Sequence, residues 1–383
     1  MRPDQRAQSR GLLLETIRRA DHIARIDLAQ ATGISRATVT AITADLIREG
    51  LIEEIARDSD DGEAPRGRPR VALRLRGAAH LVAGLKIADK AISVVIADFE
   101  GHPLASHSHR VPAPSHSPDA FAHHVAQALD AALAQAKLAR GDLSAVGIGL
   151  AGVIDAPRGH VHWSPLLTAR NFALADHLGA ALRLPTHIDN DANLVALAEM
   201  YFGTARHARD FLVVTVEAGV GLGIVLGGAL YRGTRGCGAE FGHTKVAADG
   251  AACRCGQRGC LEAYVADDAL LRAHPAPDLA SLLGDPAAAG VIAQARQYFA
   301  LGLANLVNIF DPELIILSGA GMQFDHLFTE QVIEDMRRQI VQIDTPPPQV
   351  VLHRWGDDMW ARGAAAYAIS RVCETALAQG RAA

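Results

Sequence analysis

Two distant segments of the chain follow the same plan of strand, turn and strand. Residues 81–101 and 211–233 each contain two apolar runs of strand length joined by a short turn. Further strand and helix patterns lie between them, and one predicted helix carries apolar residues on a single face: Phe121, Val125, Leu129 and Leu133. The alternation predicts an α/β fold. The repeated plan predicts two related lobes, with a ligand bound between them at the carboxyl ends of the strands.

Composition restricts the class of protein. The chain has 383 residues, of which 49% are hydrophobic and 21% are charged, and these values exclude a disordered or collagen-like chain. The length is sufficient for two or three domains. The apolar runs are far shorter than the roughly 20 residues that span a bilayer, and the charged N-terminus does not resemble a secretion signal. We therefore expect a cytoplasmic protein with no membrane helix.

The N-terminal part of the chain predicts a helix-turn-helix. Residues 12–52 indicate three short helices, with the small residue Ala29 where two helices would touch and Gly33 in the turn between them. Val39 and Ile42 would anchor the third helix on its apolar side. The other side of that helix carries short polar and cationic side chains, which suit phosphates and base edges. These candidate DNA-contacting residues are Ser35, Arg36, Thr38 and Thr40.

A predicted wing follows the three helices. Two strands, one starting at Leu51 and one over Val71–Leu75, flank a polar loop that contains glycine and proline. Arginine is favoured in narrow minor grooves, so the arginines of this loop are further candidate DNA contacts: Arg66, Arg68 and Arg70. Residues 1–78 carry 14 arginines and 12 acidic residues, a net charge of +2, whereas the rest of the chain carries −7. The alternative is a small helical interaction domain with a charged linker.

The cysteines indicate a metal site. Three of the five cysteines crowd into eight positions, which in a cytoplasmic protein favours metal over disulfide. With a nearby histidine they form a complete tetrahedral set for structural Zn²⁺: His243, Cys253, Cys255 and Cys260. The alternative is four unrelated buried residues. We expect Cys237 and Cys373 to be ordinary buried cysteines.

Polar residues that could bind a sugar lie near this set and at one strand end. Asn190 and Asp191 follow a short predicted strand, and together they offer the mixed donors and acceptors that a polyol needs. The neighbouring Asp189 is at least as well explained as a helix cap. Glu240 and Glu262 lie close in sequence to the metal ligands, so a metal would hold both carboxylates near the imidazole of His243. The glycine-rich residues 217–223 suit either a phosphate loop or a tight hairpin.

Together these patterns resemble the ROK family of sugar kinases and sugar-responsive transcriptional regulators. The resemblance rests on six segments: GLAGVID (149–155), DNDAN (189–193), GVGLGIVLGG (219–228), GAEFGH (238–243), CRCGQRGCLE (253–262) and LSGAG (317–321). It implies a winged helix-turn-helix over 1–78, followed by a two-lobed α/β fold like that of actin and hexokinase. The first lobe would span 79–196 and be completed by helix 357–380, and the second, with the zinc site and the oligomerisation surface, would span 197–356.

The resemblance also implies roles for individual residues. Asn190, Asp191, Glu240, His243 and Glu262 would hold the sugar, with His243 binding zinc through one nitrogen and the sugar through the other. Gly152 would lie at the wall of the sugar pocket, and the chain would form a homodimer or homotetramer through its C-terminal lobe. In kinases of the family the residue matching Asp191 is the general base.

Two departures from the kinase pattern predict that the chain has no catalytic residues. Kinases carry an Asp-x-Gly-x-Thr phosphate turn where this chain reads Lys86 to Lys90, and a Gly-Thr-Gly turn where it reads Glu217 to Gly219. A cation and a carboxylate thus replace groups that position phosphate and stabilise its charge. We therefore expect no sugar kinase activity.

The sequence accordingly predicts a sugar-responsive repressor of carbohydrate genes, like the family's regulators for xylose and N-acetylglucosamine. Its partners would be operator DNA and a sugar or sugar phosphate, with Lys86 available to pair with a phosphate. Two alternatives remain: a sugar kinase with an added DNA-binding domain, and a scaffold controlled by a phosphotransferase-system protein.

Overall fold

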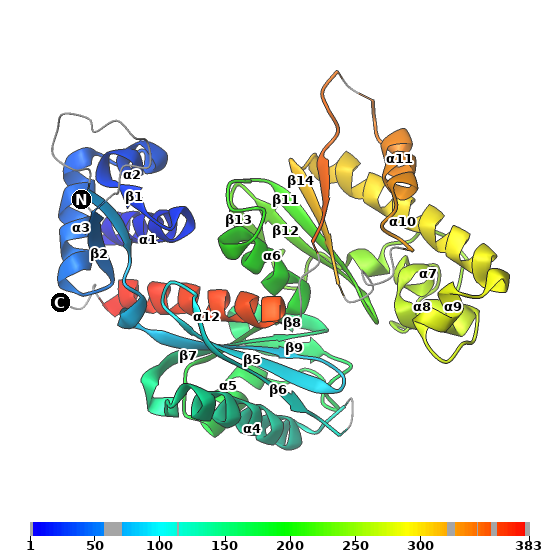
Figure 1. Cartoon of the computed structure of the whole chain (residues 1–383), viewed down its shortest axis with the longest axis horizontal. Coiled ribbons are helices and arrows are strands. Elements are labelled where there is room, and N and C mark those ends of the chain that lie inside the picture. The colour runs from blue at the N-terminus through cyan, green and yellow to red at the C-terminus, as the bar shows by residue number, and fades with distance from the viewer. Residues whose placement is uncertain are drawn as a thin grey trace. The chain divides into compact units, whose positions relative to one another are not determined.

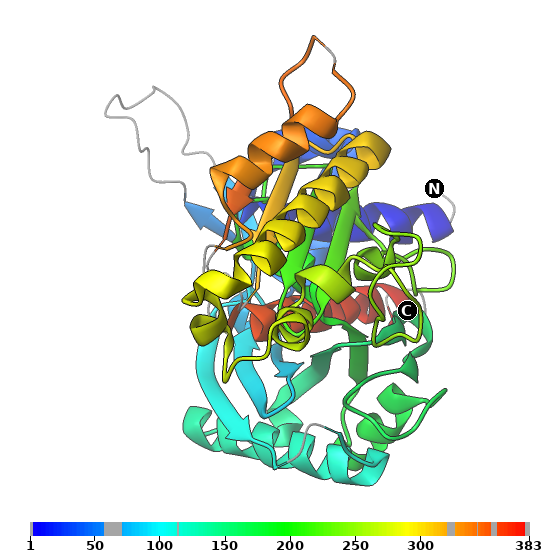
Figure 2. The same ribbon diagram turned by 90° about the vertical axis from the view of Figure 1, so that its right-hand side faces the viewer.

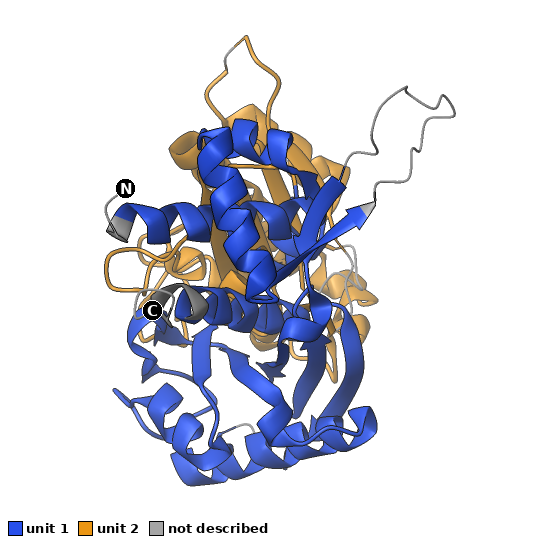
Figure 3. Cartoon of the chain, turned by 90° about the vertical axis from the view of Figure 1, so that its left-hand side faces the viewer, with its two compact units in different colours: residues 1–189, 197–206, 360–383 blue, residues 190–196, 207–359 orange. Residues whose placement is uncertain are grey.

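The computed structural model describes residues 3–56, 71–112, 115–319, 326–342, 344–353 and 358–379, which form two compact units. One unit contains residues 1–189, 197–206 and 360–383, and the other contains 190–196 and 207–359 (Figure 3). The helix-turn-helix therefore shares a compact unit with the first α/β sheet. The division into three domains at 78/79 and 196/197 remains a prediction. Among the described residues, no helix is both long and apolar enough to cross a membrane.

The N-terminal elements form a winged helix-turn-helix. Three helices, α1 (Pro3–Ala20), α2 (Arg25–Thr32) and α3 (Arg36–Arg48), pack on an antiparallel sheet of β1 (Ile23–Ala24), β3 (Val71–Leu75) and β2 (Ile52–Ala56). Gly33 ends α2 with a left-handed φ of 69°, a conformation that glycine adopts at little cost. Ser35 caps α3 by accepting a hydrogen bond from the backbone N–H of Thr38 at 3.2 Å. The predicted turn and cap are therefore confirmed.

The first α/β sheet has the strand order β10-β7-β4-β5-β6. Its strands are β4 (Leu81–Ile87), β5 (Ala91–Asp98), β6 (Pro103–Arg110), β7 (Leu143–Leu150) and β10 (Thr186–Asn190). Figure 1 shows α4 (Pro118–Ala136) and α5 (Leu174–Leu182) on one face of this sheet and α12 (Asp358–Gln379) on the other. A hairpin of β8 (Val153–Asp155) and β9 (His160–Trp163) follows β7.

The second sheet repeats the plan of the first. β11 (Phe211–Val216) pairs antiparallel with β12 (Val220–Leu226) and parallel with β14 (Leu314–Ser318), as β4 pairs with β5 and β7. β13 (Ala229–Tyr231) and β15 (Gln349–Leu352) form its edges. Figure 2 shows α10 (Ala289–Phe310) and α11 (Glu330–Gln339) across one face. The remaining helices are α6 (Asp191–Phe202), α7 (Glu262–Val265), α8 (Asp267–Ala273) and α9 (Leu279–Leu283). The internal repeat expected from the sequence is thus confirmed.

α12 lies directly against the backbone of the first sheet because two strand positions have no side chain. A Cβ on Gly84 of β4 would lie 2.0 Å from the carbonyl oxygen of Ala361, and a Cβ on Gly147 of β7 would lie 2.0 Å from that of Ala364. Both distances are too short for any real contact, and the obstacle is backbone. The glycines therefore set how closely α12 approaches the sheet.

The hydrophobic core of the winged domain continues into the first sheet and α12. Leu13, Leu14 and Ile17 of α1 are fully buried, and they belong to one cluster with Phe99, which follows β5, and Ile369 of α12. The winged domain is therefore docked on the first sheet and α12 through a shared core.

We predict that Gly147→Ala lowers the free energy of unfolding by about 1–3 kcal/mol, because α12 must move away from β7 to accept the methyl group. Urea unfolding of the whole chain measures this change. Gly141→Ala is the matched control, since a Cβ there meets nothing within 4 Å. Equal stability of the two variants would contradict the direct packing of α12 on the sheet.

Candidate functional site

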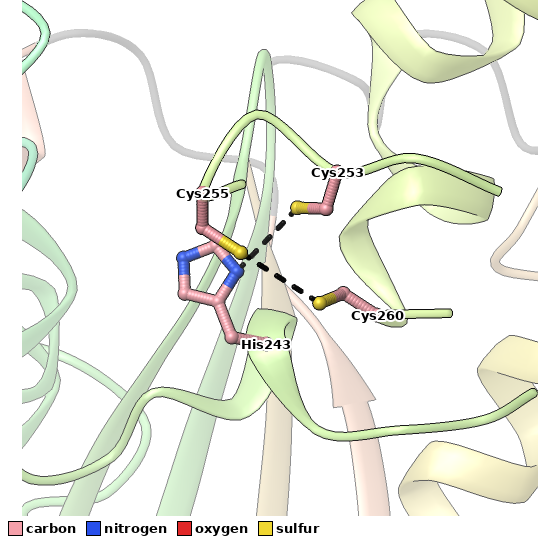
Figure 4. Close-up of side chains that lie close together, drawn as sticks. All are labelled: His243, Cys253, Cys255 and Cys260. Carbon is pink, nitrogen blue, oxygen red and sulfur yellow. Dashed lines mark hydrogen bonds between the residues drawn. The ribbon is translucent and has the colours of Figure 1, made fainter. Parts of the chain in front are cut away.

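One histidine and three cysteines converge in the second sheet's unit. His243 ends a short 3₁₀ turn, and Cys253, Cys255 and Cys260 come from the loop that leads into α7 (Figure 4). Their ligand atoms all lie within 4.8 Å of one another. The Nδ1 atom of His243 is 3.7 Å from the sulfur of Cys253, and the sulfurs of Cys255 and Cys260 are 3.8 Å apart. The sequence prediction that these four residues meet is therefore confirmed.

These distances fit a tetrahedral metal ion. With metal–sulfur bonds of about 2.3 Å and a metal–nitrogen bond of about 2.1 Å, a tetrahedron separates two sulfurs by about 3.8 Å and a sulfur from the nitrogen by about 3.6 Å. The two distances given above agree with both values. The cluster could therefore hold a metal ion without rearrangement of the backbone.

The loop that carries the cysteines is shaped by two glycines. Gly256 and Gly259 have left-handed φ values of 88° and 70°, and a Cβ on Gly259 would lie 1.6 Å from the carbonyl oxygen of Ala247. Lys245 donates to the sulfur of Cys260 at 2.9 Å. Backbone bends thus bring the cysteines together, with an ammonium group beside one of them.

A carboxylate lies beside the nitrogen of His243 that faces away from Cys253. Its Nε2 atom is 3.9 Å from the carboxylate of Glu240, while Nδ1 faces Cys253. Burial, together with the negative charges of Glu262 and Asp191, raises the pKa of Glu240 to about 7. Asp191, Glu240, His243 and Glu262 therefore form one constellation in this unit. Their roles as sugar ligands remain predictions.

The remaining predicted sugar residues lie on either side of the unit boundary. Asn190 ends β10, and its side-chain oxygen accepts from the N–H of Ala192 at 2.9 Å, as does the carboxylate of Asp191 at 3.0 Å. Gly152 lies in the other unit between β7 and β8, with a φ of 133° and no space for a Cβ beside the carbonyl oxygen of Trp163. The role of Gly152 at a pocket wall remains a prediction.

The predicted DNA-contacting face is exposed on α3. Arg36 and Thr40 are exposed, and the hydroxyl of Thr40 donates to the carbonyl of Arg36 at 2.9 Å. Ser35 is exposed and Thr38 is half-buried, and their hydroxyls are 2.9 Å apart. Arg66, Arg68 and Arg70 lie outside the described residues, so their contacts with DNA remain a prediction.

Comparison with known proteins assigns the chain to a family. Residues 82–371 match the ROK family, and residues 8–53 match the winged helix-turn-helix DNA-binding family. The chain belongs to the ROK family.

Both repressors and sugar kinases are similar to this ROK protein. It is 28% identical to the xylose repressor of Bacillus spizizenii over 80% of each chain. It is 30% identical to the glucokinase of Streptomyces coelicolor over 68% of this chain and 88% of the glucokinase. A solved ROK family transcriptional regulator, described as a homologue of the Escherichia coli MLC protein, covers 98% of both chains with a TM-score of 0.77 and 24% identity, and so shares the fold. The predicted winged helix-turn-helix and ROK fold are confirmed.

Lys86 belongs to the segment that we expect to differ from the first phosphate turn of the ROK kinases. Lys86 is buried, and its ammonium group lies 3.8 Å from the centre of the Trp360 ring on α12. Positions 82, 84 and 86 alternate along β4 and all face α12, whereas the positions between them face α4 and its core. Lys86 therefore makes a cation–π contact inside the first sheet's unit.

The second turn compared with the kinases, residues 217–219, contacts side chains that the sequence did not single out. Arg254 donates to the carbonyl of Ala218 and pairs with Asp268 at 2.9 Å, while the N–H of Asp267 donates to the carbonyl of Glu217 at 3.1 Å. Burial and the charge of Glu217 raise the pKa of Asp267 to about 7. The turn thus has both the guanidinium of Arg254 and the carboxyl group of Asp267 beside it. Arg254 stands between Cys253 and Cys255 in the sequence, and this position is the signal that could have indicated its contact with the turn.

We predict that Asp267 makes the protein less stable as the pH rises from about 4 to about 7. In this range the folded chain keeps a proton that the unfolded chain has lost, so unfolding becomes easier with rising pH. Asp267→Asn should remove this part of the pH dependence. Urea midpoints of the wild type and the variant between pH 4 and pH 8 measure it.

Asp249→Asn is the matched control, since Asp249 is exposed. A pH dependence that is identical in the wild type and Asp267→Asn would contradict the raised pKa.

Proposed function

We propose that the protein is a sugar-responsive repressor whose binding to operator DNA changes when a sugar or sugar phosphate binds its ROK domain. The observation that carries this proposal is that one chain combines a winged helix-turn-helix with the constellation of Asp191, Glu240, His243 and Glu262. Similarity to repressors over 78–80% of the chain supports it. Asn190 adds an amide to the constellation, and Gly152 of the other unit would border the bound sugar.

The metal is proposed to be a structural Zn²⁺ ion held by His243, Cys253, Cys255 and Cys260. When bound, the ion supplies a fixed centre of positive charge and a cross-link, because four protein ligands leave no open position for catalysis. His243 would then be oriented so that Nε2 and the carboxylate of Glu240 bind hydroxyl groups of the sugar. An imidazole nitrogen and a carboxyl group together offer both donors and acceptors.

Repression would follow from linkage between the two ligands. A sugar that favours one arrangement of the lobes changes the operator affinity, and operator changes the sugar affinity by the same factor. Two winged domains of a homodimer or homotetramer would bind half-sites about 34 Å apart or a multiple of that distance. A phosphotransferase-system protein in place of the sugar is a further proposal, and we expect the protein to act in the cytoplasm, where DNA is accessible.

A sugar kinase is the second candidate, because the chain is 30% identical to a glucokinase. Asp191 would be its base. We propose that the chain has no such activity, since Lys86 faces Trp360 and the carboxylates of Glu217 and Asp267 border the second turn. A coupled assay with ATP and hexoses tests this, and turnover that is lost in Asp191→Asn would establish the kinase instead.

The proposed function predicts that a sugar stabilises the protein and changes its affinity for DNA. Xylose, glucose and N-acetylglucosamine, free and phosphorylated, are tested by thermal shift on zinc-loaded protein. A ligand at 100 times its dissociation constant adds about 2.7 kcal/mol of stability.

Operator duplexes are selected from a random library, and their release is measured by fluorescence anisotropy. Asp191→Asn should lose the sugar effect and keep operator binding. Operator binding that no sugar changes would move the proposal to the protein-partner alternative.

The zinc proposal predicts that Cys255→Ser loses bound zinc and sugar binding together. Loss of one ligand weakens the site that orients His243, whose other nitrogen faces Glu240. Elemental analysis measures zinc, and calorimetry measures sugar affinity. Cys237→Ser is the matched control, since Cys237 does not belong to the cluster. Full sugar affinity of Cys255→Ser without metal would contradict the proposed role of zinc.

A further inference from the structure

A polar junction is buried where α1 of the winged domain meets α6 and α12. Arg18 of α1 is only 6% exposed, and it donates to the hydroxyl of Ser370 at 2.7 Å and to the carbonyl of Ala366 at 2.8 Å, both on α12. Its guanidinium carbon lies 3.6 Å from the centre of the Tyr201 ring of α6. The hydroxyl of Tyr201 in turn donates to the carboxylate of Glu15 on α1 at 2.6 Å. All these residues belong to one compact unit.

This polar junction constrains the position of α1 in a way that the apolar core around it does not. Leu13, Leu14 and Ile17 already bury the apolar side of α1, and burying a guanidinium costs free energy unless it is paired. Hydrogen bonds and the ring contact are directional, so they define the rotation and register of α1, which apolar packing alone leaves loose. The Nε atom of Arg18 is buried without a hydrogen-bond partner among the described residues.

α6 connects this junction to the candidate sugar site. The helix is continuous from Asp191 to Phe202, so its first turn and Tyr201 are about 15 Å apart along the axis. At its start, the side chains of Asn190 and Asp191 both accept from the N–H of Ala192. Any sugar hydroxyl that takes over these bonds changes the start of the helix that carries Tyr201.

Both ends of α6 are closely packed, so the helix has little freedom to absorb such a change. Near its start, Ala192 leaves no room for a Cβ on Gly221 or Gly223 of β12, with distances of 2.8 and 2.7 Å. At its end, the Phe202 ring would be 2.4 Å from a Cβ on Gly101, and the guanidinium carbon of Arg362 lies 4.5 Å from the ring centre. A displacement at one end is therefore passed along the helix as a whole.

We propose that Tyr201, through its contacts with Glu15 and Arg18, is the positioning residue that transmits occupancy of the sugar site to the DNA-binding helices. This inference rests on the proposed function. A movement of α6 changes the position of the Tyr201 hydroxyl relative to Glu15, and α1 then adopts a different register on α12. The orientation of α3 changes with it, because α1, α2 and α3 share one core.

Tyr201→Phe tests the proposal on full-length, zinc-loaded protein. The variant keeps the ring beside Arg18 and removes only the hydroxyl that donates to Glu15. Operator affinity is measured with and without the stabilising sugar from the panel of xylose, glucose, N-acetylglucosamine and their phosphates. Couplings between sites are typically about 5- to 150-fold, and we expect the variant's ratio to fall at least about threefold below that of the wild type. Sugar affinity in the absence of DNA should stay within about twofold.

Two further variants separate transmission from simple loss of structure. Glu15→Ala removes the same hydrogen bond from the other side, so it should reduce the coupling equally, and the double variant should reduce it no further. Tyr231→Phe is the matched control, because Tyr231 is an exposed tyrosine of β13. Hydrogen exchange of the α1 amides in the wild type should change on addition of sugar, and this change should be smaller in Tyr201→Phe.

Each outcome decides the proposal. Equal changes of operator affinity with and without sugar, or an unchanged coupling ratio, would overturn the role of Tyr201 while leaving the repressor function intact. A wild type that binds none of the sugars, or whose operator affinity no sugar changes, would overturn the proposed function and this inference with it.

Discussion

The contact of α12 with the backbone of β4 and β7 organises the unit that contains the DNA-binding domain. Gly84 and Gly147 let the helix approach until its own backbone meets the strands. In this position Trp360 of α12 lies over Lys86. Ser370 and the carbonyl of Ala366, further along the same helix, accept hydrogen bonds from Arg18. The surroundings of Lys86 and the anchor of the winged domain thus depend on the same helix.

The cluster of His243 and the three cysteines organises the other unit in a comparable way. Its cysteine loop carries Arg254, which bonds the carbonyl of Ala218 and pairs with Asp268, and leads directly to Glu262. Glu262 accepts from the N–H of Val220 at 3.3 Å and so also touches the glycine-rich turn. One loop therefore connects the candidate metal ligands, a candidate sugar ligand and the glycine-rich turn.

Local patterns in the sequence account for what could be predicted. The cap at Ser35, the turn at Gly33 and the four convergent metal ligands depend on residues close together in the chain, whose chemistry allows few alternatives. The repeated plan of strands was equally visible, because antiparallel neighbours follow one another in sequence. These features also carry the family resemblance.

The features that could not be predicted join residues far apart in sequence. Arg18 and Ser370 are ordinary surface residue types, and nothing near either of them indicates a buried bond between the two. The raised pKa of Asp267 likewise arises from burial beside Glu217, which only the folded chain shows. The grouping of the winged domain with the first sheet follows from such contacts too.

The late position of α12 in the chain has a consequence for synthesis on the ribosome. The winged helices and the first sheet are complete at residue 190, whereas the helix that covers that sheet begins at residue 358. At about 5–20 residues per second, roughly 10 to 30 s of translation separate the two. During this time α1 lacks its partners on α12 and the apolar face around Gly84 and Gly147 is open. In a nascent chain the winged domain is therefore complete before the helix that anchors it has been made.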